Sequence, residues 1–158
     1  MSALTGFSIV HREQVRWGDL DAFGHVNNTV FFCYFESARI AYFPAATLIE
    51  NVICVEGAGR ILGQASCQFL RPIRFPCELL VGVRVTEVRT NSFKMEYAIV
   101  DAKAPSDLPF ARGDSVIVMI DFGTGPKGRR INKSIDIPPQ PSGAFCPTDE
   151  HRKPTFVG

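Results

Sequence analysis

Apolar and polar residues alternate along several segments of the chain, a pattern typical of β-strands with one buried face. The alternation is plainest in residues 77–88, where Leu79, Val81, Val83 and Val85 share one parity. The same reasoning predicts five strands, at residues 7–17, 61–73, 77–88, 93–99 and 110–122. Short turns between successive strands predict an antiparallel sheet.

Residues 28–45 have a different period, with apolar side chains every three or four positions, which predicts a helix. The members of this stripe are Phe31, Tyr34, Phe35, Ala38, Ala41, Tyr42 and Ala45. Phe32 and Phe43 lie outside the stripe, so we expect the helix to be apolar almost all round and largely surrounded by other structure. Pro44 predicts that the helix ends or kinks near residues 42–43, and a short helical turn through Leu48 and Ile49 is expected to follow.

The composition changes after Gly123, where proline becomes frequent and the periodicity fades. We therefore predict one domain at residues 1–135 and a proline-rich, irregular C-terminal tail at residues 136–158. The 158 residues are enough for a single domain with a real core.

The overall composition excludes several functional classes. Hydrophobic residues make up 46% and charged residues 21%, and the formal net charge of +1 argues against binding to a nucleic-acid backbone. No apolar run approaches the roughly 20 residues of a membrane span. The N-terminal residues lack the apolar core of a signal peptide, so a cytoplasmic protein is expected.

The five cysteines are odd in number and show no close pair. This spacing argues against a disulfide framework and against a zinc site, so we expect buried, reduced thiols and no bound metal.

Polar side chains gather just before the predicted helix, at Asp19, Asp21, His25, Asn27 and Asn28. A helix N-terminus offers free N–H groups and a positive dipole end, which favour anions and developing oxyanions. A helix cap needs only one such residue. We therefore interpret the cluster as a candidate active site rather than as a cap alone.

The stretch Asp19-Leu20-Asp21-Ala22-Phe23-Gly24-His25-Val26-Asn27-Asn28, followed by Glu36-Ser37-Ala38-Arg39, resembles the signature of the hotdog-fold acyl-CoA thioesterases. It is most similar to the 4-hydroxybenzoyl-CoA thioesterase-like group. A second segment, Arg89-Thr90-Asn91-Ser92-Phe93, is similar to the turn that contacts coenzyme A in that family. The resemblance spans residues 7–122 and implies an α+β hotdog fold, in which an antiparallel sheet of about five strands wraps around one long central helix.

The resemblance also implies roles for individual residues. Asp21 would be the catalytic carboxylate, acting as nucleophile or general base on the thioester, although a turn acceptor is the alternative for this side chain. The N–H of Asn28 would stabilise the oxyanion, and His25 would orient water, bind Asp21 or hold the loop.

Substrate-binding candidates are Asn27, Glu36, Arg89, Ser92 and Lys94. Asn27 is also expected to cap the helix or position the loop. Glu36 is expected to pair with Arg39 three residues on, and it is a minor rival for the catalytic carboxylate because some hotdog thioesterases use a helix Glu.

The implied activity is hydrolysis of an acyl-CoA thioester to a free acid and coenzyme A, with no cofactor beyond the substrate itself. A non-catalytic module that binds acyl-CoA or an acyl carrier protein is the alternative, and a hotdog hydratase or dehydratase is a third. The resemblance further implies a homodimer or homotetramer with active sites at the interface. An open sheet leaves an unpaired edge, and residues 61–73 are the candidate edge strand.

Overall fold

The computed structural model describes residues 3–45, 58–105, 108–121, 133–137 and 155–157. Its elements, in chain order, are β1 (Ile9–Gln14), the 3₁₀ turn η1 (Trp17–Asp19), α1 (Asn28–Ala45), β2 (Ala58–Phe69), β3 (Glu78–Val88), β4 (Ser92–Asp101), β5 (Ala111–Asp121), β6 (Lys133–Ser134) and β7 (Thr155–Val157).

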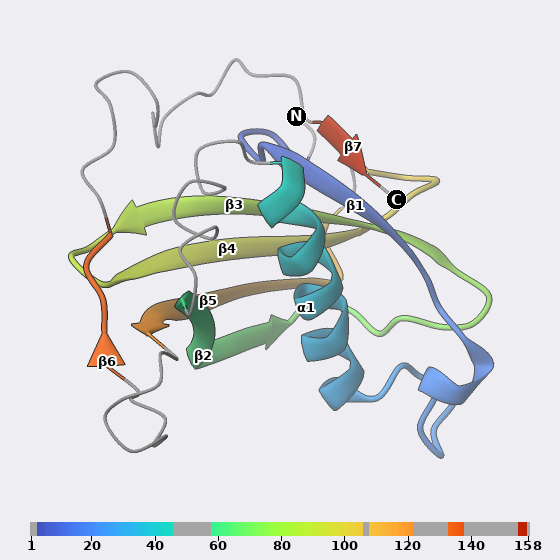
Figure 1. Cartoon of the computed structure of the whole chain (residues 1–158). Helices are drawn as coiled ribbons and strands as arrows, with labels where there is room; N and C mark the ends of the chain where they lie inside the picture. Colours follow the sequence, from blue (N-terminus) through green and yellow to red (C-terminus); the bar gives the residue numbers. More distant parts are fainter. Residues whose placement is uncertain (1–2, 46–57, 106–107, 122–132, 138–154, 158) are drawn as a thin grey trace.

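The strands form one sheet in the order β2-β5-β4-β3-β1-β7, with β6 beside β5 (Figure 1). The pairs among β1 to β6 are antiparallel, and β7 runs parallel to β1. All five predicted strands are present with shifted ends. The first strand is shorter than predicted because Trp17 turns out of it into η1 and is 74% exposed.

Helix α1 lies across one face of the sheet, and the main core fills the space between them (Figure 1). The inward positions of β3 alternate as predicted, so that Leu79, Val81 and Val83 are fully buried. Phe35 from the helix stacks on Tyr97 from β4, with ring centroids 4.7 Å apart. One α-helix on an antiparallel sheet, as the described residues form it, is the predicted hotdog architecture.

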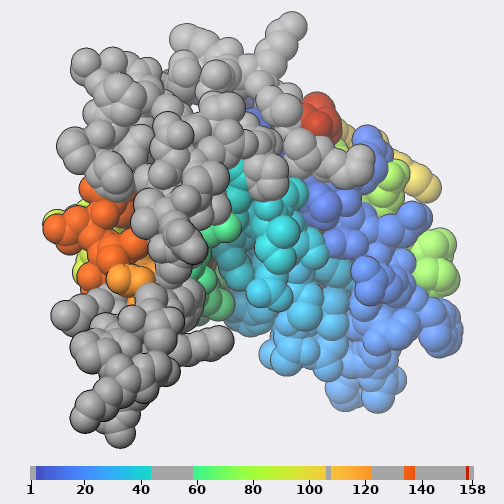
Figure 2. Space-filling model, in the orientation of Figure 1, coloured from blue at the N-terminus to red at the C-terminus, as the bar shows by residue number. Residues whose placement is uncertain are grey.

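The helix differs from its prediction in two ways. It is not enclosed all round, because Phe32 is 37% and Ile40 is 63% exposed, and α1 reaches the surface in Figure 2. One sheet covers only one side of a helix, which explains the open face. The helix also continues through Pro44 to Ala45, since a proline in the final turn removes only one intrahelical hydrogen bond. Leu48 and Ile49 lie outside the described residues.

A smaller core lies on the opposite face of the sheet, where the N-terminal segment folds over the strands. Its buried members are Leu4, Phe7, Val10, Leu80, Ala98 and Val100. The sheet is therefore covered by the helix on one side and partly by residues 3–10 on the other.

The two edges of the sheet differ in whether another strand of the described residues pairs with them. The β1 edge is paired with β7, which consists of three residues of the predicted C-terminal tail. The other edge is β2, and nearly all its described residues are at least partly exposed. The strand predicted at residues 61–73 to be an edge strand, here β2, thus lies at an edge of the sheet.

Candidate active site

The polar turn between η1 and α1 is a narrow ladder of backbone hydrogen bonds. The N–H of Asp21 donates to the carbonyl of His25 at 2.7 Å, and the N–H of Asn27 donates to the carbonyl of Asp19 at 2.9 Å. Gly24 closes the tip with φ of +75°, a conformation that other residues rarely adopt. The fold thereby brings the predicted residues of the turn into one compact unit.

The Asp21 carboxylate is partly engaged within its own turn. Its Oδ1 accepts the N–H of Phe23 at 2.8 Å and the N–H of His25 at 3.3 Å. Within the part of the chain that the structure describes, its Oδ2 has no hydrogen-bond donor. One oxygen therefore fixes the orientation of the carboxylate, and the other is available for chemistry.

Asp19 has a structural role. Its Oδ2 accepts the N–H of Arg16 at 2.8 Å and the hydroxyl of Tyr34 at 2.7 Å, so it joins η1 to the helix. Burial, followed by this bond to Asp19, raises the pKa of Tyr34 far above its ordinary value, which keeps the phenol protonated as the donor.

The start of α1 shows how the two asparagines differ. Oδ1 of Asn27 accepts the N–H of Thr29 at 3.0 Å and its hydroxyl at 2.9 Å, which makes Asn27 the helix cap. Asn28 is the first helical residue, and its N–H has no acceptor among the described residues. That free N–H at the positive end of the helix fits the predicted oxyanion donor.

His25 follows the tip of the turn and is partly buried. Its Nε2 is buried and has no hydrogen-bond partner among the described residues. An unpartnered buried nitrogen costs free energy, and such atoms in a native structure often indicate a functional role. This unsatisfied nitrogen is what makes His25 a candidate for the site, although the atom is closed to solvent in this structure.

The segment between β2 and β3 contacts the polar turn and holds it in place. The sequence pattern did not predict this contact. The N–H of Val26 donates to the carbonyl of Ile73 at 2.9 Å, and the rings of Trp17 and Phe75 meet edge to face at 5.7 Å. These contacts join residues that are far apart along the chain, so periodicity gives no signal for them.

Glu36 lies away from the turn, on the exposed side of α1. It pairs with Arg39 at 3.3 Å, as its spacing along the helix predicted. Both line a crevice of about 150 Å³ between α1, β2 and β5, together with Phe32, Leu62 and Asp114. Glu36 is thus placed to contact a ligand in that crevice.

The predicted coenzyme A contacts are on the hairpin between β3 and β4. Figure 1 places this hairpin at the opposite end of the sheet from the blue segment that holds η1 and the polar turn. The guanidinium of Arg89 binds Glu87 at 2.7 and 3.1 Å, and Ser92 is buried. Lys94 lines a groove with Arg112 and Asp114. A single subunit therefore does not bring Arg89, Ser92 and Lys94 to Asp21.

Two of the three described cysteines are poor nucleophiles, and the third is exposed. Burial raises the pKa of Cys67 to about 11 and also raises the pKa of Cys77, so both thiols stay protonated near neutral pH. Cys33 is free and exposed on the helix.

The described residues contain no cluster of three His, Cys, Asp or Glu side chains that could hold a metal ion. The predicted absence of a cofactor and the predicted cytoplasmic location stay predictions.

None of the helices described is both long enough and apolar enough to span a bilayer.

Comparisons with known proteins agree with this architecture. A family model described as "Thioesterase-like superfamily" matches residues 15–145. Uncharacterized protein YsmA of Bacillus subtilis is 32% identical over 94 residues, which are 59% of this chain and 61% of that protein. The chain spans less than two thirds of the curated relatives that it matches, at 61% and 56% of their lengths.

Two solved structures are also similar. The PA2801 protein from Pseudomonas aeruginosa superposes with a TM-score of 0.69 at 25% identity, over 84% of this chain and 93% of that one. A thioesterase from Thermus thermophilus, complexed with coenzyme A and Zn, is 32% identical with a TM-score of 0.59, over 81% of this chain and 86% of that one.

Proposed function

Because this chain belongs to the thioesterase-like superfamily, we propose that it hydrolyses an acyl-CoA thioester to a free acid and coenzyme A. The observation that carries the proposal is the polar turn itself. It presents an oriented carboxylate at Asp21, an unpartnered nitrogen at His25 and a free helix N–H at Asn28. These are the three kinds of group that acyl transfer needs.

In the proposed reaction, Asp21 supplies the attack on the thioester carbonyl. Its Oδ2 either removes a proton from an attacking water or attacks the carbon itself, giving an anhydride that water then hydrolyses. In both routes the carbon–sulfur bond breaks and coenzyme A leaves as the thiol. The Asn28 N–H stabilises the negative charge on the carbonyl oxygen, and His25 positions the water.

Asn27, Glu36, Arg89, Ser92 and Lys94 stay as proposed substrate contacts. Since the hairpin carrying Arg89 lies far from Asp21 in one subunit, its contact with the same coenzyme A molecule requires a second subunit. We take a homodimer as the minimum assembly, formed through the open edge of β2. The exposure of Leu62 and Phe69 on that edge strand supports this assignment.

A second candidate function is a non-catalytic module that binds acyl-CoA or an acyl carrier protein. The observation in its favour is that Oδ1 of Asp21 accepts two backbone N–H groups, which is the behaviour of a residue that only shapes a turn. In that case the turn would bind a thioester without hydrolysing it.

The test is a panel of acyl-CoA substrates of different chain lengths and aromatic groups, with release of free thiol measured by a thiol reagent. We expect turnover by the unmodified protein and a loss of at least about a hundredfold in Asp21→Asn, because the amide cannot act as base or nucleophile. His25→Ala should fall between the two.

Glu36→Gln is the comparison variant, since it neutralises the rival carboxylate, itself a proposed substrate contact, without touching the turn. If Asp21→Asn kept more than about a tenth of turnover while Glu36→Gln abolished it, the wrong carboxylate would have been chosen. Tight acyl-CoA binding with no thiol release on any substrate would favour the binding module.

A further inference from the structure

The side chain of Tyr34 reaches from the second turn of α1 back to the polar turn. The residue is 4% exposed, and its hydroxyl donates to Oδ2 of Asp19 at 2.7 Å. The same oxygen accepts the N–H of Arg16 at 2.8 Å. A residue of the helix thus holds the segment that enters the turn, and the proposed reaction has so far made no use of this contact.

Asp19 links this tyrosine to both halves of the proposed site. Along the chain it precedes Asp21, the proposed base or nucleophile, by two residues. Its backbone carbonyl accepts the N–H of Asn27 at 2.9 Å, and Asn27 immediately precedes Asn28, whose N–H is the proposed oxyanion donor. The positions of the carboxylate and of the donor are therefore linked through Asp19, and Tyr34 fixes Asp19 to the helix that begins at Asn28.

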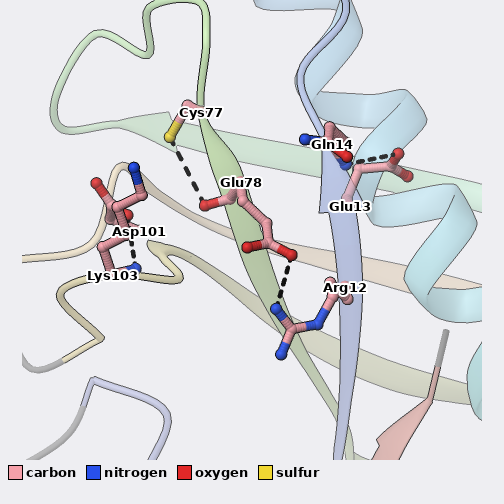
Figure 3. Close-up of polar contacts among 7 residues, drawn as sticks. All are labelled: Arg12, Glu13, Gln14, Cys77, Glu78, Asp101 and Lys103. Atoms are coloured by element: carbon pink, nitrogen blue, oxygen red, sulfur yellow. Dashed lines mark hydrogen bonds and ion pairs between the residues drawn. The ribbon is translucent and has the colours of Figure 1, made fainter.

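The surroundings of Tyr34 keep its hydroxyl in the donor form. Burial raises the pKa of this phenol most, and the bond to Asp19 and the negative charge of Glu13 raise it further. In Figure 3 the side chains of Glu13 and Arg12 leave β1 on opposite sides, and Arg12 pairs with Glu78 at 2.7 Å. The phenol of Tyr34 therefore stays protonated near neutral pH and can donate to Asp19.

Acyl transfer depends on the distance between the attacking group and the oxyanion donor, because both act on the same carbonyl group. We propose that Tyr34 is a positioning residue, which sets this distance by holding Asp19 through its hydroxyl. This role rests on the proposed thioester hydrolysis and adds a residue that the reaction needs although it does not touch the substrate. A tyrosine with a purely structural role would stabilise the fold and leave the turnover of the folded protein unchanged.

The first experiment measures kcat and KM of Tyr34→Phe on an acyl-CoA that the unmodified protein hydrolyses. A misplacement of about 1 Å can cost about a hundredfold in rate, so we expect the smaller shift after loss of one hydrogen bond to lower kcat by about tenfold. KM should change less than about twofold, because the groups that move act in the transition state. Each variant is assayed at a temperature at which it is fully folded.

Tyr42→Phe is the matched control. It removes the same atom from another buried tyrosine of α1, which is 5% exposed and lies about two turns further along the helix. Because Tyr42 is remote from the polar turn, its variant should keep the kcat of the unmodified protein. An equal fall in kcat in both variants would indicate a general loosening of the helix.

Variants of Asp19 test whether the tyrosine acts through that residue. The hydroxyl of Tyr34 and the N–H of Arg16 donate to the same oxygen, so the single amide oxygen of Asp19→Asn can accept both and should keep most of the turnover. Asp19→Ala removes the acceptor and should lower kcat at least as much as Tyr34→Phe. Adding Tyr34→Phe to Asp19→Ala should then cost nothing further, because the two side chains act as one unit.

Hydrogen exchange gives a readout that needs no turnover. In Tyr34→Phe the amide of Asn27, which donates to Asp19, should exchange at least about threefold faster, in line with the loss of one hydrogen bond. Buried amides of β3 should keep their exchange rates, because the turn opens locally. Equally faster exchange at Asn27 and throughout β3 would indicate global destabilisation and contradict the positioning role.

Three kinetic results would also overturn this role. Tyr34→Phe could keep the kcat of the unmodified protein, Tyr42→Phe could lower kcat equally, or Tyr34→Phe and Asp19→Ala could lower it additively. The proposed function fails in a different way, since the unmodified protein would then hydrolyse no thioester. Turnover that does not depend on the Tyr34 hydroxyl would reject the positioning role alone.

Discussion

Asp19 and Asp21 lie two residues apart, yet their carboxylates have different partners. Asp19 uses one oxygen to tie η1 to the helix through Tyr34, while Asp21 uses one oxygen to hold the turn and keeps the other free of any donor among the described residues. Their neighbours thus give Asp19 a structural role and leave one oxygen of Asp21 free for the reactive role that we propose.

Tyr34→Phe tests the structural role of Asp19. The change removes a hydrogen bond to a carboxylate, so we expect a loss of about 1.5–3 kcal/mol in the free energy of unfolding. Chemical denaturation at neutral pH measures it. Thiol release on a saturating acyl-CoA should change much less than in Asp21→Asn.

The same variant should alter the response to alkali. The folded-state pKa of Tyr34 is raised, first by burial and then by Asp19, so its stabilising effect is complete below the pKa of an unfolded tyrosine, about 10. That part of the stability is lost as pH rises past about 10. Stability curves from pH 8 to 11 should fall less steeply in Tyr34→Phe, and parallel curves would contradict the assignment.

At the scale of elements, the ring of Phe35 from α1 lies directly against the backbone of Gly113 in β5. A Cβ there would lie 2.4 Å from a ring carbon of Phe35 and 2.7 Å from the backbone oxygen of Ser66. Phe35 is itself stacked on Tyr97, so a shift of the ring would disturb that contact. The absence of a side chain at Gly113 therefore makes room for the Phe35 ring.

Gly113→Ala should therefore destabilise the fold by about 1–3 kcal/mol through overpacking, as measured by denaturant unfolding. Gly18→Ala is the control, because a Cβ at Gly18 meets nothing within 4 Å and should leave stability nearly unchanged. Equal stability of the two variants would show that the helix can shift without cost.

Local pattern was enough to predict α1 and the strands β1 to β5, because alternation and helical spacing are properties of neighbouring residues. It did not predict η1, β6 or β7, since elements of two or three residues are too short to show a period. It predicted the cap at Asn27 and the edge position of β2 as well. It did not predict the exposure of Phe32 and Ile40, since burial depends on what covers a helix and not on its own apolarity. The contact of Trp17 with Phe75 also has no local signal, because it joins distant segments.

For the molecule as a whole, the contrast between the two sheet edges argues for assembly. One edge is closed by β7, and the other, β2, presents Ile61, Leu62 and Phe69 in partly exposed positions. An open edge with apolar side chains is a surface for pairing with another chain. A second copy of this chain offers the same edge in return.

Leu62→Lys should weaken the proposed dimer at least about tenfold, because it places a charge from each copy at the shared edge. Sedimentation at micromolar concentrations measures the change. Val88→Lys is the control, since Val88 is also exposed and apolar but lies at the end of β3, away from β2. A monomeric unmodified protein would contradict the assembly.

The pairing of β7 with β1 has a consequence for how the protein is made. Ile9–His11 leave the ribosome long before their neighbours Thr155–Val157 have been translated. Throughout that interval the β1 edge has no partner of its own, and it is closed only once residues 155–157 have emerged as well. A product truncated before these residues would leave the β1 edge, like that of β2, without a partner strand among the described residues, so completed translation protects the chain against wrong association.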